Sequence, residues 1–164
     1  MASGDGSRFK LLGLAELNDL PEPSWLIEGI LAANAVVVLY GASAIGKTFV
    51  ALSMALSVAA GHPWCGKPTK SGSVLYVAAE GVFGLKLRVQ AYQGRHRIDA
   101  KDIRYLGEGF DLRQAADIKQ LVAILEAADF RPNLVVLDTR TINSRRRREL
   151  SARHRQSDLG HRRA

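Results

Sequence analysis

Residues 41–48, with the sequence GASAIGKT, constrain the fold of this 164-residue chain more than any other feature. They match G-x-x-x-x-G-K-[ST] without a gap, the pattern of a loop whose backbone N–H groups surround phosphate oxygens. The continuous apolar run at residues 35–40 predicts a buried strand before the loop, and a helix is expected at residues 47–60. A strand, a phosphate loop and a helix in this order predict a nucleotide-binding α/β unit.

Each position of the loop has an expected role. Lys47 is expected to reach the β and γ phosphates, and the Thr48 hydroxyl is expected to bind Mg²⁺. The positive end of the following helix favours an anion at the same place. The residues expected to bind the nucleotide are Gly41, Ala42, Ser43, Ala44, Ile45, Gly46, Lys47 and Thr48.

Strands and helices alternate along the rest of the chain. Further strands are expected at residues 73–79, 102–107 and 134–138, and further helices at residues 85–93 and 112–128. This alternation predicts a parallel sheet with helices on its faces. On the helix at 47–60, helical spacing predicts one buried face made of Val50, Ala51, Met54, Ala55 and Val58.

Two carboxylates follow predicted strands. Asp138 ends the strand at 134–138, where a Mg²⁺-linked acid is expected, and Glu80 follows the strand at 73–79. The ends of parallel strands share one edge of the sheet with the phosphate loop, so both acids are expected to face the γ-phosphate. Phosphoryl transfer to water needs a metal-binding acid and a group that activates the water. Glu80 is therefore a candidate general base, although either acid alone could be an ordinary strand-end carboxylate.

The positive charge of the chain is concentrated at its end. The net charge is +7, and residues 144–164 contribute +6 of it, with eight arginines against Glu149 and Asp158. The single cysteine, Cys65, and the absence of an apolar leader at residues 1–10 predict a cytoplasmic protein. The longest mostly apolar run, residues 49–60, is too short to span a bilayer, so no membrane association is expected.

Several stretches together resemble a known family. They are WLIEGIL, VVVLYGASAIGKT with a following GHPWCGK, GSVLYVAAEG and NLVVLDT. These motifs, spread over residues 25–139, are similar to those of the RepA-like hexameric helicase ATPases of plasmids and phages, within the RecA/KaiC-type P-loop class. The resemblance implies an α/β fold, a RecA-like P-loop NTPase core with a parallel sheet flanked by helices, with the C-terminal strands missing.

The resemblance also implies roles and partners. Glu80 would be the catalytic glutamate and Asp138 the acid that binds Mg²⁺ together with Thr48, while Lys47 acts in catalysis by holding the phosphates of ATP. The full-length parent would be a homo-hexamer that couples ATP hydrolysis to movement on single-stranded DNA. Arg88 matches a position that is often basic in the family, although a surface charge is the simpler interpretation. Trp25 and Trp64 match family positions as well, and core packing is expected for both.

The family pattern changes at residues 144–164. The family strand is usually followed by a loop containing Gly-Asp-Glu-Asn-Ser, whereas this chain has RRRRELSARHRQSD. One set of codons for this arginine-rich stretch, read one base later, encodes Gly-Gly-Asp-Glu-Asn-Ser, which resembles the family loop. The expectation is a change of reading frame shortly before Arg145. The alternative is a genuine basic arm that binds nucleic acid phosphates.

The expected organisation has three parts: a flexible lead-in at 1–24, a partial RecA-like ATPase domain at 25–143, and a basic, disordered tail at 144–164. The principal functional interpretation is an ATP-binding ATPase that forms the N-terminal part of a RepA-like DNA helicase. One alternative is a RecA/KaiC-type ATPase of regulation or recombination. The other is a non-enzymatic nucleic-acid binder that acts through its arginine-rich tail.

Overall fold

The computed structural model describes residues 11–78, 82–108 and 110–138. Its centre is a three-stranded parallel sheet in the order β4-β3-β5, formed by Ile103–Leu106, Val74–Ala78 and Leu134–Asp138. In β3 and β5, Val74 pairs with Leu134 and Ala78 pairs with Asp138, so these strands run in register to their ends. This arrangement confirms the predicted α/β class with a RecA-like P-loop core.

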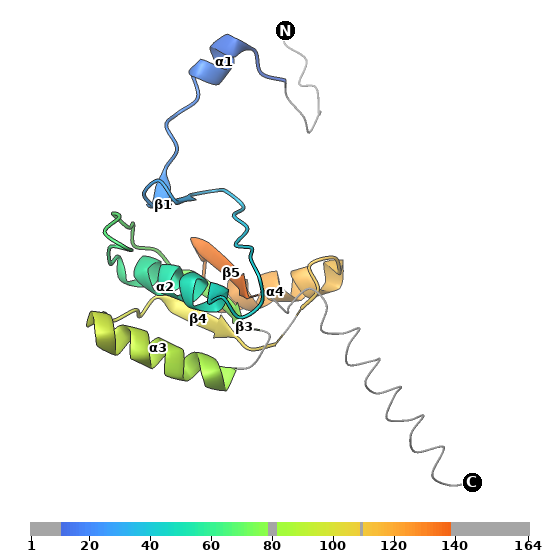
Figure 1. Ribbon diagram of the computed structural model, residues 1–164. Coiled ribbons are helices and arrows are strands. Elements are labelled where there is room, and N and C mark those ends of the chain that lie inside the picture. The colour runs from blue at the N-terminus through green and yellow to red at the C-terminus, as the bar shows by residue number, and fades with distance from the viewer. Residues whose placement is uncertain (1–10, 79–81, 109, 139–164) are drawn as a thin grey trace.

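Helices cover both faces of this sheet (Figure 1). Helix α2 (Lys47–Ala60) and helix α3 (Val82–His96) lie over one face, and α4 (Ala115–Ala127) lies over the other. Side chains of β3 alternate between the two: Val74, Tyr76 and Ala78 pack with α2, whereas Leu75 and Val77 pack toward α4. All five are buried because β3 is the central strand of the sheet.

The helix α2 has clear ends. It is preceded by Gly46, and Gly61 follows it in the left-handed conformation with φ 62°. The N–H of His62, the residue after Gly61, donates to the carbonyl of Ser57 at 2.9 Å, so a carbonyl of the last helical turn has a hydrogen-bond partner. The predicted bounds of this helix are therefore confirmed.

The buried face of α2 differs from the predicted one. Ala55 and Val58 are buried as expected, but Val50, Ala51 and Met54 are only half-buried. The helix is apolar almost all round, so helical spacing alone could not select its inner face. The other buried positions are Leu52, Leu56, Ser57 and Ala59.

A small antiparallel pair precedes the phosphate loop. It consists of β1 (Trp25–Ile27) and β2 (Leu31–Ala32), and the N–H of Lys70 donates to the Leu26 carbonyl at 2.9 Å. The pair is thereby joined to the loop after α2, and Ile27 is fully buried against the main core. Upstream, the five-residue helix α1 (Leu14–Asn18) has no buried residue and stands away from the sheet in Figure 1.

Residues 35–40 do not form the predicted buried strand. They belong to no strand or helix, and Val36 and Tyr40 are 95% and 87% exposed. An apolar run becomes a strand only where a neighbouring strand supplies hydrogen bonds and cover. This segment lies outside the three-stranded sheet, so its composition alone does not make it a strand.

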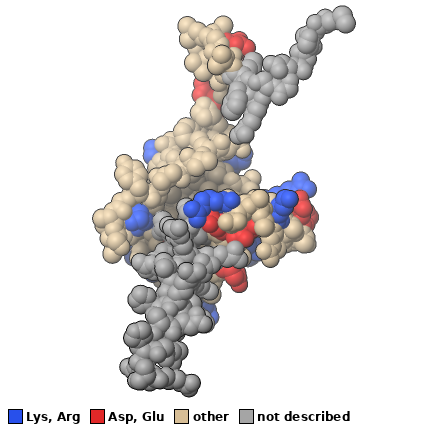
Figure 2. All heavy atoms as spheres, turned by 90° about the vertical axis from the view of Figure 1, so that its right-hand side faces the viewer, with Lys and Arg blue, Asp and Glu red and all other residues tan. Residues whose placement is uncertain are grey.

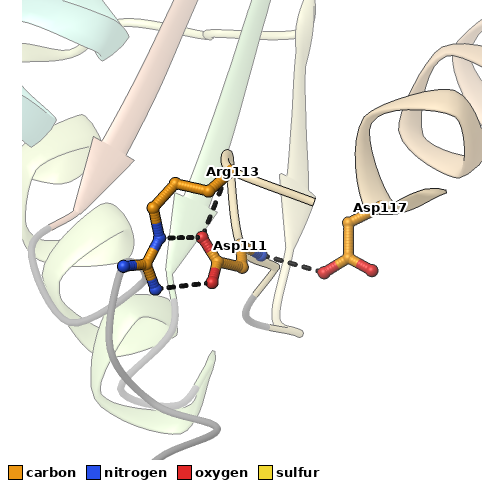
Figure 3. A network of polar contacts seen from close by, with 3 residues as sticks. All are labelled: Asp111, Arg113 and Asp117. Carbon is orange, nitrogen blue, oxygen red and sulfur yellow. Dashed lines mark hydrogen bonds and ion pairs between the residues drawn. The ribbon is translucent and has the colours of Figure 1, made fainter. Parts of the chain in front are cut away.

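The entry into α4 is held by a polar network (Figure 3). Arg113 donates from Nε and Nη2 to the two carboxylate oxygens of Asp111, at 2.9 and 2.7 Å. The backbone N–H of Asp111 donates to Asp117 in the first turn of the helix at 2.9 Å. The turn before α4 is thus fixed to the helix that covers the sheet.

Charged side chains are mixed on the face shown in Figure 2, where Lys and Arg lie beside Asp and Glu. Within the described part of the chain, no helix is long and apolar enough to cross a membrane.

Candidate functional site

The phosphate loop takes the curled form that its glycines predict. Gly46 has φ 95° and Ala44 has φ 63°, so the backbone has positive φ at two positions just before α2 begins at Lys47. At Gly46 this conformation favours glycine, because a side chain there would strain the backbone. The start of α2 leaves backbone N–H groups without intrahelical acceptors, which is the usual basis of an anion site.

Lys47 folds back over the loop. Its Nζ donates to the carbonyl oxygens of Gly41 at 3.0 Å and Ala42 at 2.6 Å. The loop residues 41–45 are exposed beside this ammonium, so an anion could contact the loop and the Lys47 ammonium together. The contribution of Lys47 to phosphate binding stays a prediction.

Thr48 and Asp138, the two residues expected to bind Mg²⁺, are brought together by the fold. Thr48 Oγ1 donates to Asp138 Oδ1 at 3.2 Å, across 90 residues of sequence. Thr48 lies in the first turn of α2 and Asp138 is the last residue of β5. The end of the sheet therefore meets the phosphate loop, as parallel-strand topology predicts.

Tyr76 also contacts Asp138, and sequence reasoning missed it. Its hydroxyl donates to Asp138 Oδ2 at 2.9 Å, and its side chain is fully buried in the centre of the sheet. Burial, and then the adjacent Asp138 carboxylate, raise the pKa of Tyr76 well above its ordinary value. A signal was present in the sequence: a tyrosine within an otherwise aliphatic buried strand needs a partner for its hydroxyl.

Glu80, the predicted general base, lies outside the described residues. The strand that leads to it ends at Ala78, directly opposite Asp138 in the register of β3 and β5. Its catalytic contribution therefore stays a prediction from the sequence.

The sequence resemblance singled out three other residues, Arg88, Trp64 and Trp25. The guanidinium of Arg88 lies 5.0 Å from the ring centre of Phe49, which joins α3 to the first turn of α2. Trp64 packs against the main core, as predicted, and its Nε1 donates to Ser53 Oγ at 2.8 Å. Trp25, the first residue of β1, is exposed and belongs to neither core cluster, so the prediction of core packing was wrong for it.

The donor set near the loop fits magnesium. Magnesium takes oxygen ligands and usually receives only one or two from the protein, with the remainder from phosphates and water. Thr48 supplies a hydroxyl and Asp138 a carboxylate, already within hydrogen-bond distance of one another. Among residues 11–78, 82–108 and 110–138, no three His, Cys, Asp or Glu residues are grouped to hold a metal. The arrangement fits an ion that arrives with a phosphate ligand.

A separate cavity of about 250 Å³ lies between α3 and β4. It includes no residue of the phosphate loop. Its lining is almost wholly apolar and consists of Val82, Leu85, Lys86, Val89, Gln90 and Tyr105.

Comparison with known proteins agrees with this geometry. Neither the curated proteins nor the solved structures give a significant match to the chain. The family model of the AAA domain matches residues 8–143, which include the phosphate loop, Tyr76 and Asp138. The chain therefore belongs to the AAA domain family of P-loop ATPases.

Proposed function

We propose that this protein binds ATP with Mg²⁺ between the phosphate loop and the end of β5, and hydrolyses it. The observation that carries the proposal is the hydrogen bond from Thr48 to Asp138. It joins a hydroxyl in the phosphate loop to a strand-end carboxylate, and a pair of this kind holds Mg²⁺ in P-loop NTPases.

In this proposal the loop amides and Lys47 bind the phosphates and fix their orientation. Thr48 and Asp138 hold the metal, which would supply positive charge against the phosphate oxygens. Glu80 would accept the proton of the attacking water, since it follows the strand adjacent to β5. The catalytic contribution of the chain is then mainly positioning and charge stabilisation.

The finer proposal is that ATP turnover serves movement on single-stranded DNA in a six-membered ring, as in RepA-like helicases. The support is the set of sequence motifs from WLIEGIL to NLVVLDT, which span residues 25–139. Turnover measured with and without single-stranded DNA tests this part. Stimulation by DNA supports it, whereas equal rates favour the RecA/KaiC-type regulatory or recombination ATPase.

The nucleotide proposal is tested by Lys47→Ala, with Lys119→Ala as the matched control. Lys119 is an exposed lysine of α4, so it reports the effect of losing one positive charge. A charge-assisted hydrogen bond contributes about 1.5–3 kcal/mol, so Lys47→Ala should weaken ATP binding by roughly 10- to 100-fold. Titration calorimetry with Mg·ATP measures the affinity, and circular dichroism verifies that each variant is folded.

The catalytic step is tested by Glu80→Gln. This variant should bind Mg·ATP like the wild type but lose turnover, because an amide cannot accept the proton of water. Equal ATP affinity in the wild type and Lys47→Ala would refute the nucleotide site. Normal turnover in Glu80→Gln would remove Glu80 from the mechanism and leave the binding proposal intact.

A further inference from the structure

Tyr76 is the one polar side chain of β3 that points to the face covered by α2. Its neighbours on that face, Val74 and Ala78, are apolar, and all three are buried. A buried phenol hydroxyl is costly unless it has a hydrogen-bond partner. Its partner is Asp138 Oδ2, at 2.9 Å, so the hydroxyl is directed at a residue of the candidate metal site.

The register of the sheet explains how the two side chains meet. Tyr76 pairs with Val136, and Asp138 lies two residues further along β5, therefore on the same face of the sheet. The tyrosine is long enough to span this offset from the neighbouring strand. A phenylalanine at position 76 would fill the same space without reaching the carboxylate with a donor.

Both oxygens of the Asp138 carboxylate accept a hydrogen bond. Oδ1 accepts from Thr48 and Oδ2 accepts from Tyr76. Rotation about the last torsion of an aspartate is only weakly restricted, so a carboxylate needs such partners to hold one orientation. Because Tyr76 comes from the rigid centre of the sheet, it fixes which oxygen faces the phosphate loop.

We propose that Tyr76 is a positioning residue that orients the Asp138 carboxylate toward Thr48 and thereby raises the affinity of the nucleotide complex for Mg²⁺. This inference rests on the proposed function, in which Thr48 and Asp138 hold the metal. Groups that orient metal ligands typically change metal affinity by 10- to 100-fold when removed. Tyr76 acts through Asp138, so its effect should appear in the magnesium dependence of binding.

The chain offers a matched control in Tyr105. It lies on β4 opposite Tyr76 in the register, and the two ring centres are 6.2 Å apart. Tyr105→Phe removes a neighbouring hydroxyl from the same face of the sheet. Comparing Tyr76→Phe with Tyr105→Phe separates the hydrogen bond to Asp138 from a general effect of losing a phenol.

The experiment measures ADP binding by calorimetry over a series of Mg²⁺ concentrations and again in EDTA, with circular dichroism as the check of folding. For Tyr76→Phe, the Mg²⁺ concentration that gives half of the maximal increase in ADP affinity should rise by about 10-fold or more. The ADP affinity of this variant in EDTA should be unchanged. Tyr105→Phe should follow the wild type. Asp138→Asn probes the same contact from the other side, and adding Tyr76→Phe to it should cause no further shift.

Three results would overturn the inference. An unchanged magnesium dependence in Tyr76→Phe would show that the hydroxyl does not orient the metal ligand. Equal losses of ADP affinity with Mg²⁺ and in EDTA would show that Tyr76 only supports the fold. If folded wild-type protein bound no ADP or ATP under any condition, the proposed function would fall first, and the inference with it.

Discussion

Replacing Leu56 by alanine should strongly destabilise the protein. Leu56 lies in α2, is completely buried, and belongs to the core cluster that joins α2 to β3. Alanine lacks three of leucine's carbon atoms, and their transfer from water is worth about 2.4 kcal/mol. A residual cavity of about 70 Å³ would add roughly 1.7 kcal/mol. We therefore expect the free energy of unfolding to fall by about 4 kcal/mol.

Urea unfolding followed by far-UV circular dichroism measures this change. With a slope near 2 kcal/mol per molar urea, the midpoint should move down by about 2 M. The control is Leu87→Ala, a leucine of α3 that is 69% exposed and should change stability by less than about 0.5 kcal/mol. If both variants lose the same amount, or Leu56→Ala loses less than about 1 kcal/mol, the described packing of α2 on the sheet is wrong.

Two further predictions concern the sheet. Asn133→Ala should lower stability by about 1 kcal/mol in the same assay, because Asn133 Oδ1 accepts hydrogen bonds from Ser73 N and Oγ at 2.9 and 3.1 Å. No measurable change would show that this contact does not hold the starts of β3 and β5 together. Burial raises the pKa of Tyr105 to about 12 from 10.0, so the fold favours its neutral form. The contribution of neutral Tyr105 to the free energy of unfolding is present below pH 10 and is lost as the pH rises toward 12. Over this pH range the urea midpoint of the wild type should therefore fall more steeply than that of Tyr105→Phe. If the urea midpoints of the two proteins fell in parallel with pH, the raised pKa of Tyr105 would not be the cause of the loss.

Local sequence signals predicted the positions of some elements well. Residues 47–60 and 134–138 have the bounds that were expected, because glycines end α2 and a Pro-Asn turn precedes β5. Helix α3 extends beyond the expected residues 85–93 to Val82–His96. Its interior glycines, Gly84 and Gly94, weakened the helical signal at both ends.

Features that depend on distant neighbours were harder to predict. The run at residues 35–40 has the composition of a buried strand, but strand formation requires partners that no local pattern specifies. For the site, motif chemistry predicted Lys47, Thr48 and Asp138, and the structure brings the last two together. Tyr76 was missed because its hydrogen bond depends on the register between β3 and β5, which only the fold determines.

The contact between Thr48 and Asp138 has a consequence for the order of events during synthesis. The two residues are 90 positions apart, so at ribosomal speeds roughly 5 to 20 s separate their translation. During that interval the phosphate loop has been synthesised, whereas its acidic counterpart does not yet exist. A nascent chain could therefore gain no stabilisation from magnesium nucleotide through this pair until β5 has been made and has docked beside β3.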